Sequence, residues 1–346
     1  MPEQTRPKIL MIYTGGTIGM KENDRTQALE PFDFNHLIDN VPKLKKLDYD
    51  IGHYQFANPI DSAAMKPADW IQIAKVIEEN YDEFDGFVVL HGTDTMAYTA
   101  SALSFMLENL DKPVIITGSQ LPIGEVRTDG EENLITAIQI AAAKEPDGTK
   151  TVREVAILFE NNLWRGNRST KRSADNFDAF RSNNYPELAR IGLYITFNKE
   201  ALWHGNKDHK PLKVNYNLDS SVMVIDLFPG IEERVVRHSL ATPGVKGIVL
   251  KTFGAGNGPT DPWFYDALRE AVENGKVIVN ITQCENGGVQ PNRYACGLEL
   301  AQTGVISGHD LTKEAAITKL MYLFGLNLPA EKVKELMEKN LRGEIS

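Results

Sequence analysis

Cysteine is scarce in this chain of 346 residues, which contains only Cys284 and Cys296. The two are not spaced as CxxC, so the sequence indicates neither a disulfide framework nor a cysteine-based zinc cluster. We expect each to serve as a small buried apolar residue. The seven histidines include no HExxH motif and no i, i+4 pair, so no metal site is predicted.

Long apolar runs and an excess of positive charge are also absent. No run approaches the roughly 20 apolar residues of a membrane-spanning helix, and the first eight residues contain no apolar signal segment. The formal net charge is -10, whereas proteins that bind nucleic acid usually carry a basic face. We therefore expect a cytoplasmic protein with neither a membrane nor a nucleic acid as partner.

What the chain does contain is a regular alternation of strand-like and helical segments. The composition is ordinary for a globular protein, with 42% hydrophobic and 24% charged residues, and the length suggests about two domains. In the first half, the patterns predict helices at 67–80, 95–110 and 131–143 and strands at 86–90, 113–117 and 155–159. Such a βαβ series produces a mostly parallel sheet with helices on both faces.

The periodicity weakens between about residues 183 and 219 and then resumes. The second series predicts strands at 222–226, 247–250 and 276–282, helices at 232–240 and 261–274, and two closing helices. We therefore predict two three-layer α/β domains with mostly parallel sheets. The larger N-terminal domain would span residues 1–190 and the smaller C-terminal domain residues 219–346, with a linker at 191–218.

Two threonine-rich turns follow predicted strands in the first half. Thr14 to Gly19 reads TGGTIG and follows the apolar run 8–13, while Gly92 to Thr95 reads GTDT and follows the run 87–91. Open α/β folds place their chemistry at the carboxyl ends of the strands, so the turns are expected to form one site. A basic stretch ending at Lys171 lies further on. Threonine, carboxylate and lysine are the parts of an activated hydroxyl nucleophile.

Other interpretations of these residues stay open. The glycine-rich turn fits neither the dinucleotide fingerprint nor the Walker loop, so it is a poor phosphate site, although it could simply be a tight strand exit. Thr93 or Asp94 could cap the following helix, but a carboxylate at that position is also well placed to bind an ammonium group. Ser62 lies in what could be an ordinary Asp-Ser turn. We expect His91, at the end of a buried strand, to be structural and not a catalytic base.

Four motifs in this order resemble the signature of the bacterial cytoplasmic (type I) L-asparaginases. A single GGTIG would not be specific, but the set is, and the likeness extends through residues 280–284 and the closing residues 340–344. The motifs are Thr14-Gly-Gly-Thr-Ile-Gly19, Asp61-Ser62, His91-Gly-Thr-Asp-Thr-Met96 and Arg165-Gly-Asn-Arg-Ser-Thr-Lys171.

The resemblance implies hydrolysis of L-asparagine to L-aspartate and ammonia without a metal or organic cofactor. Thr17 would be the nucleophile that forms an acyl-enzyme, and Thr93, Asp94 and Lys171 would form a second group that activates a hydroxyl or water. Thr93 and nearby backbone N–H groups would stabilise the oxyanion. The assembly would be a homodimer or a homotetramer. The substrate-binding positions implied are Asp61, Ser62, Ala63, Thr93, Asp94 and Tyr294.

The chain departs from the family pattern at the loop after the first turn. Family members often have a tyrosine there that assists the nucleophile, but residues 21–30 contain none. The group that activates Thr17 is therefore left open. We hypothesise that Tyr294 reaches the Thr17 region of a neighbouring subunit, the alternative being a tyrosine packed within its own domain.

Some relatives carry a second, regulatory asparagine pocket, and the resemblance places its counterpart here. The matching positions are Thr170, Lys251, Thr282, Gln283 and Cys284. Where those relatives have an arginine, this chain has Lys251, which supplies a point charge in place of a bidentate fork.

Two other functions share the same fold. One is the asparaginase-like subunit of a tRNA-dependent amidotransferase, which normally adds an amino-terminal domain; the acidic charge balance disfavours it. The other is a catalytically silent amino-acid sensor, which is disfavoured because Thr17, Thr93, Asp94 and Lys171 are all present. Release of ammonia from asparagine by the protein alone would separate the three.

Overall fold

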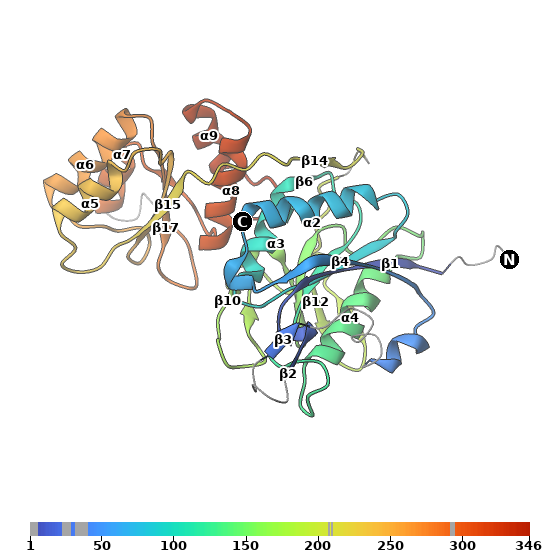
Figure 1. Cartoon of the computed structure of the whole chain (residues 1–346). Helices are drawn as coiled ribbons and strands as arrows, with labels where there is room; N and C mark the ends of the chain where they lie inside the picture. The colour runs from blue at the N-terminus through green and yellow to red at the C-terminus, as the bar shows by residue number, and fades with distance from the viewer. Residues whose placement is uncertain (1–5, 23–28, 32–40, 207, 209, 291–294) are drawn as a thin grey trace. The chain divides into compact units, whose positions relative to one another are not determined.

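The chain folds into two compact units in a computed structural model that describes residues 6–22, 29–31, 41–206, 208, 210–290 and 295–346 (Figure 1). The N-terminal unit comprises Met1–Ser182 and Pro186–Tyr216, and the C-terminal unit comprises Asn183–Tyr185 and Asn217–Ser346. Residues 191–218, expected to form a linker, include the strands β13 (Ile195–Phe197) and β14 (Lys213–Val214), and most of the segment belongs to the N-terminal unit.

The N-terminal unit is built on an eight-stranded sheet. The five strands β8-β7-β5-β1-β4 are parallel to one another, and β9, β12 and β13 extend the sheet beyond β8 with antiparallel pairing. In spatial order, the strands are β13 (Ile195–Phe197), β12 (Ala189–Ile191), β9 (Asn162–Arg165), β8 (Val155–Phe159), β7 (Val114–Thr117), β5 (Gly86–Leu90), β1 (Lys8–Gly15) and β4 (Asp50–Ile60).

The strands of this sheet that could be predicted from apolar runs in the sequence are the buried ones. Every residue of β5, β7 and β8 is buried, as expected for parallel strands covered on both faces. The helix α4 (Gly130–Ala142) packs on β5 and β7, while α2 (Pro67–Glu79) and α3 (Met96–Met106) lie on the opposite side of the sheet (Figure 1). Nearly every residue of α3 is buried, which fits its apolar sequence on all sides.

Short elements complete the N-terminal unit. Among the described residues, short 3₁₀ helices occupy Thr17–Gly19, Pro42–Lys46, Ser62–Ala64 and Gly166–Arg168. The two-stranded pairs join β2 (Met20–Glu22) to β3 (Leu29–Pro31), β6 (Leu107–Glu108) to β14 (Lys213–Val214), and β10 (Thr170–Lys171) to β11 (Phe180–Arg181).

The order of the strands reverses beside β1. The chain leaves β1, adds β4 on one side and then places β5 on the other side, so the strand order reverses between β1 and β5. The Thr14 hydroxyl donates a hydrogen bond of 2.9 Å to the Leu90 carbonyl and joins the carboxyl ends of these two strands. Open α/β sheets bind their ligands at this kind of reversal.

The C-terminal unit has a parallel four-stranded sheet in the order β15-β16-β17-β18. An apolar core fills the space between this sheet and the helices α5 and α6, and α8 and α9 cover its other face (Figure 1). The elements are β15 (Val222–Asp226), α5 (Glu233–Leu240), β16 (Gly247–Thr252), α6 (Pro262–Glu273), β17 (Val277–Thr282), α7 (Ala295–Gln302), β18 (Ile306–Ser307), α8 (Lys313–Gly325) and α9 (Ala330–Met337).

A buried ion pair fixes the end of the chain to this unit. Lys319 of α8 lies 2.6 Å from Glu344, and both side chains are completely buried. Glu344 also accepts hydrogen bonds from the backbone N–H groups of Leu341 and Arg342, and Lys319 donates to the Met337 carbonyl. These additional bonds offset part of the cost of burying two charges.

The predicted fold class, two α/β domains with mostly parallel sheets, is confirmed. Among the described residues, no helix is long and apolar enough to cross a membrane.

Candidate active site

Three turns from the carboxyl edge of the large sheet are pressed against one another. A Cβ atom at Gly16 would lie 2.4 Å from the Gly92 nitrogen, and a Cβ atom at Gly92 would lie 2.5 Å from the Ser62 hydroxyl. Gly16 also has φ +88°, a conformation that side chains rarely adopt. Glycine is therefore required for the turn after β1 to meet the turns after β5 and β4.

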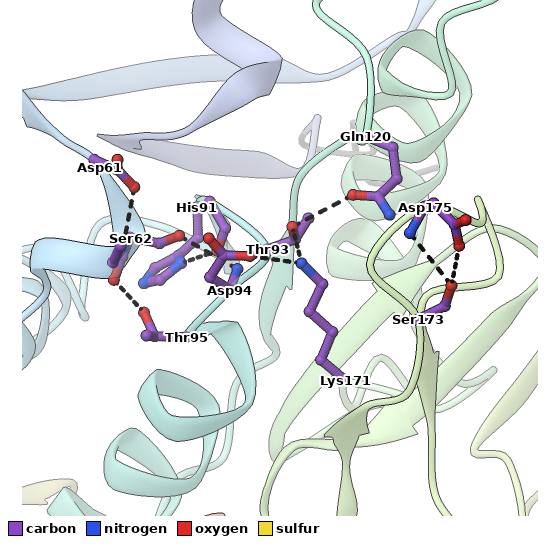
Figure 2. A network of polar contacts seen from close by, with 12 residues as sticks. Asp61, Ser62, His91, Thr93, Asp94, Thr95, Gln120, Lys171, Ser173 and Asp175 are labelled. Atoms are coloured by element: carbon purple, nitrogen blue, oxygen red, sulfur yellow. Dashed lines mark hydrogen bonds and ion pairs between the residues drawn. The ribbon is translucent and has the colours of Figure 1, made fainter.

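Thr93, Asp94 and Lys171 form a hydrogen-bonded group at this edge (Figure 2). Lys171 Nζ donates to Thr93 Oγ1 at 2.8 Å and to Asp94 Oδ1 at 2.7 Å. The Lys171 side chain is 18% exposed, whereas that of Asp94 is 61% exposed. The lysine is thus held among protein groups, while the carboxylate faces outward, where a cationic ligand can reach it.

Lys171 arrives at the site on a strand outside the large sheet. It ends β10, where it pairs with Phe180 of β11, and it lies 78 residues from Thr93 in the sequence. Thr170 precedes it and pairs with Arg181.

Ser62 connects the end of β4 to the start of α3. Its hydroxyl accepts a hydrogen bond from the Asp94 backbone N–H at 3.3 Å, and its carbonyl accepts one from the Thr95 hydroxyl at 2.7 Å. Asp61 caps the single-turn helix by accepting from the Ala63 N–H at 3.0 Å. Ser62 is buried, whereas Asp61 and Ala63 are exposed beside it. The Asp-Ser turn is therefore a regular capped turn that also contacts the Thr93–Asp94 segment.

A hydrogen bond connects the turn that carries Thr17 to β1, the strand that precedes it. The buried Tyr13 hydroxyl donates to the Gly19 carbonyl at 2.8 Å, and burial raises the pKa of Tyr13 to about 12. The phenol therefore keeps its proton at neutral pH and holds the turn closed. Thr17 itself is half-buried.

His91 has the structural role that we expected. Its ring is fully buried. Nδ1 donates to the Gly92 carbonyl at 2.7 Å, and Nε2 accepts from the Thr99 hydroxyl at 2.8 Å, which in turn accepts from the Trp70 indole at 2.9 Å. Burial lowers the pKa of His91 to about 4. A neutral imidazole with both nitrogens occupied cannot serve as a general base at neutral pH.

Gln120 belongs to this group although the sequence reasoning missed it. It follows β7 and its side-chain oxygen accepts from the Thr93 hydroxyl at 3.4 Å (Figure 2). The signal that could have indicated it is its position at the carboxyl end of a buried strand, the same position that identified the other turns.

Two of the candidate regulatory residues of the C-terminal unit contact Asp226. Lys251 Nζ lies 2.7 Å from one oxygen of this carboxylate, and Gln283 Nε2 donates to the other at 2.8 Å. The Thr282 hydroxyl donates to the Gly254 carbonyl and accepts from the Cys284 N–H. These candidate residues lie at or just beyond the carboxyl ends of β16 and β17.

The two cysteines differ from the sequence expectation. Cys284 is exposed because it lies in the loop after β17, so the expectation that it is buried is wrong. Cys296 is half-buried and donates to the Asn257 side chain. Tyr294 lies outside the described residues. Within the described part of the chain, no three His, Cys, Asp or Glu side chains are grouped to hold a metal ion.

Comparison with known proteins identifies the family. The family "Asparaginase, N-terminal" matches residues 8–203, and the family "Glutaminase/Asparaginase C-terminal domain" matches residues 221–337. The chain belongs to the asparaginase family. It is 43% identical to L-asparaginase 1 of Escherichia coli K12 over 99% of this chain and 98% of that one.

Two further relatives show how far the similarity extends. The crystal structure of L-asparaginase I from Vibrio cholerae superimposes with a TM-score of 0.88 at 43% identity, covering 99% of this chain and 100% of that one. One component of the glutamyl-tRNA(Gln) amidotransferase of Methanococcus maripaludis is 34% identical over 98% of this chain but only 80% of its own length. These matches confirm the predicted family and the predicted enzyme class, that of an L-asparaginase.

Proposed function

We propose that this protein hydrolyses L-asparagine to L-aspartate and ammonia through an acyl-enzyme formed on Thr17. The observation that carries the proposal is the contact of Lys171 with Thr93 and Asp94, at 2.8 and 2.7 Å, beside the turn that bears Thr17. A lysine held against a threonine hydroxyl, next to a second threonine on a glycine turn, is an arrangement suited to nucleophilic catalysis.

The reaction runs in two steps. The Thr17 oxygen attacks the side-chain amide carbon of asparagine, its proton passes to the departing nitrogen, and the C–N bond breaks to release ammonia. Water then attacks the resulting ester carbon, the bond to the Thr17 oxygen breaks, and Thr17 regains a proton as aspartate leaves. Thr93 with Lys171 serves as the proton-transfer group, and the backbone N–H groups of the two turns stabilise the oxyanion.

The polar residues at the edge of the site bind the α-ammonium and α-carboxylate groups of the substrate. The exposed Asp94 carboxylate receives the α-ammonium group, and the Ser62 hydroxyl with the Ala63 segment receives the α-carboxylate, while Asp61 lies beside them and shapes the turn. The 61% exposure of Asp94 supports this assignment, because a carboxylate that is not enclosed by its own chain remains available to a ligand.

Two finer features are part of the same proposal. Lys251 and Gln283, which contact Asp226, together with the neighbouring Thr282 and Cys284, form a second asparagine site that regulates the first. The active assembly is a homodimer or homotetramer in which Tyr294 of one subunit completes the site of its neighbour. The family match and the polar side chains gathered at Asp226 support the regulatory part.

The decisive experiment measures ammonia release from L-asparagine by the purified full-length chain. Release is expected from the wild type and from Thr196→Ala, a change at an exposed threonine of β13, but not from Thr17→Ala. Absence of release by the wild type would contradict the proposal and favour a binding-only protein or an amidotransferase component that needs tRNA. A covalent adduct of Thr17→Ala with a reactive asparagine analogue would place the nucleophile elsewhere.

A further inference from the structure

Gln120 is held rigidly at the edge of the site. Its backbone N–H donates to both oxygens of the Asp129 carboxylate at 3.0 Å, and the next N–H, that of Leu121, donates to Asp129 at 3.2 Å. Asp129 stands at the start of α4 and is buried, and it also accepts from the Asn133 amide at 3.2 Å. The segment that carries Gln120 is therefore fixed to the helix that packs on β5 and β7.

The orientation of the Gln120 amide is decided by its second contact. Nε2 lies 2.9 Å from the Asn176 carbonyl, which can only accept, so the nitrogen must face Asn176. The amide oxygen must then face the Thr93 hydroxyl at 3.4 Å. Gln120 thus bridges the turn that bears Thr93 and the loop that continues from Lys171.

The orientation of the Gln120 amide determines which hydrogen bonds the Thr93 hydroxyl donates and accepts. The ammonium group of Lys171 donates to Thr93 Oγ1 at 2.8 Å, which uses one lone pair of the hydroxyl oxygen. The Gln120 oxygen can only accept, so it takes the hydrogen of the Thr93 hydroxyl. The second lone pair of Thr93 stays available to an incoming hydroxyl or water.

We propose that Gln120 is a positioning residue that holds the Thr93 hydroxyl hydrogen away from Lys171 in the resting enzyme. This inference rests on the proposed function, in which Lys171 receives a proton through Thr93. For that transfer, the hydrogen must rotate from Gln120 to an uncharged Lys171 nitrogen. A hydrogen bond of 3.4 Å is long and weak, so the rotation costs little. Gln120 therefore influences the equilibrium between the resting arrangement, in which the Thr93 hydroxyl donates to Gln120, and the reactive arrangement, in which it donates to Lys171.

Charged side chains of several elements lie near this contact. Asp94 comes from the turn after β5, Asp129 from the start of α4, and Asp175 and the Arg172–Asp178 ion pair from the loop after β10. Glu160, which follows β8, interacts electrostatically with Asp129 and Asp178. A carboxylate in place of the Gln120 amide would add a negative charge beside Lys171 and favour the ammonium form. An apolar chain of the same length would remove the acceptor and weaken the resting arrangement.

The test compares the acid limb of kcat/KM against pH in the full-length enzyme with two variants of similar size. Gln120→Glu should move the midpoint of this limb up by about half a unit to one unit, and Gln120→Met should move it down by a few tenths. Gln72, whose side chain also makes a 3.4 Å contact, to the Tyr54 hydroxyl, supplies matched controls. Gln72→Glu and Gln72→Met should keep the wild-type midpoint.

The outcomes separate this inference from the proposed function. A wild type that releases no ammonia contradicts the proposed function itself. An active wild type in which Gln120→Met leaves the midpoint unchanged or raises it overturns only the positioning role, even if the rates fall or the added charge in Gln120→Glu raises the midpoint. If Gln120→Met does not fold, Gln120→Leu, which also lacks the acceptor, takes its place, and a midpoint that stays or rises in that variant overturns the inference.

Discussion

At the scale of single residues, the site depends on where protons reside. Near one edge of the sheet, Tyr13 keeps its proton, His91 stays neutral, and Lys171 contacts both a hydroxyl and a carboxylate. Of these, only Lys171 touches a group that can exchange a proton with a substrate. We therefore expect substitution of Lys171 to reduce the rate of the reaction.

Replacing Lys171 with methionine should reduce kcat by about two to four orders of magnitude, the usual effect of losing a general base. Methionine has a similar length but cannot donate to Thr93 and Asp94, so the proton-transfer group is lost. Lys199→Met, which removes an exposed lysine paired with Glu145, is the control and should keep wild-type turnover. Circular dichroism should show both variants folded. Near-normal activity of Lys171→Met would refute the assigned role.

His91 should make the stability of the fold depend on pH. Burial lowers its pKa from 6.5 to about 4, so between these values the unfolded chain binds a proton that the folded chain does not. The resulting stability is fully present above about pH 6.5 and is lost as the pH falls toward 4, by about 3 kcal/mol in all.

The measurement is the thermal midpoint at pH 7 and pH 4.5. The wild type should lose more than His91→Gln between these two values, even if the variant is less stable at pH 7. His238→Gln, a change at an exposed histidine of α5, should follow the wild type. Parallel curves for the wild type and His91→Gln would show that this histidine does not control the acid sensitivity.

At the scale of elements, the site is made by turns that glycine allows to touch. Gly16 and Gly148 offer a matched comparison because their φ angles are +88° and +87°, while only Gly16 has a neighbour. Alanine at either position strains the backbone, but only at Gly16 does the new Cβ atom meet Gly92, at 2.4 Å from its nitrogen. Comparing the two alanine variants therefore separates the effect of the contact between the turns from the effect of backbone strain.

Gly16→Ala should therefore lower kcat/KM by about a hundredfold or more, since a displacement of about 1 Å at a reacting group can cost that much. Gly148→Ala should keep its activity and show only the loss of thermal stability that backbone strain causes. Steady-state kinetics and thermal midpoints measured on both variants check this. Equal activity losses in the two variants would mean that strain, and not the contact between the turns, is responsible.

The elements also show which parts of the fold the sequence could predict. The expected strands 86–90, 155–159 and 222–226 coincide with β5, β8 and β15. All three are mostly apolar and contiguous in sequence; β5 and β8 are buried throughout, as expected for strands that are covered on both faces, whereas β15 lies at the edge of its sheet and is only partly buried. The edge strand β4 was not predicted because its sequence mixes polar and apolar residues with no run of either. The hairpin β12–β13 has three residues per strand and no apolar run to identify it.

The same limit applies to the site. Thr93, Asp94 and Lys171 could be named from the sequence because the family motifs contain them. The position of Gln120 at the carboxyl end of a predicted strand is visible in the sequence, but its role is not, because that role depends on β7 lying beside β5 and on a contact with Asn176, 56 residues away. Contacts between segments so far apart leave no periodicity in the sequence.

At the scale of the whole molecule, the chemistry and the proposed regulation reside in different units. Thr93, Asp94 and Lys171 belong to the N-terminal unit, whereas Lys251 and Gln283 belong to the C-terminal unit. Two sites with separate cores can influence one another only through a coupling free energy. Cooperative kinetics are the sign of such coupling.

If the group around Asp226 binds a second asparagine, the velocity curve should be sigmoidal. Lys251→Ala should then change the Hill coefficient more than the maximal velocity, because it removes the 2.7 Å ion pair with Asp226 without touching Thr93, Asp94 or Lys171. The control is Lys246→Ala, which removes a 2.7 Å ion pair with Asp219 in the same unit and should leave the curve unchanged. Initial rates across a wide range of asparagine concentrations supply the test. A hyperbolic wild-type curve would argue against cooperative regulation, and equal effects of the two lysine variants would show that the loss of any such ion pair, and not a ligand site, alters the kinetics.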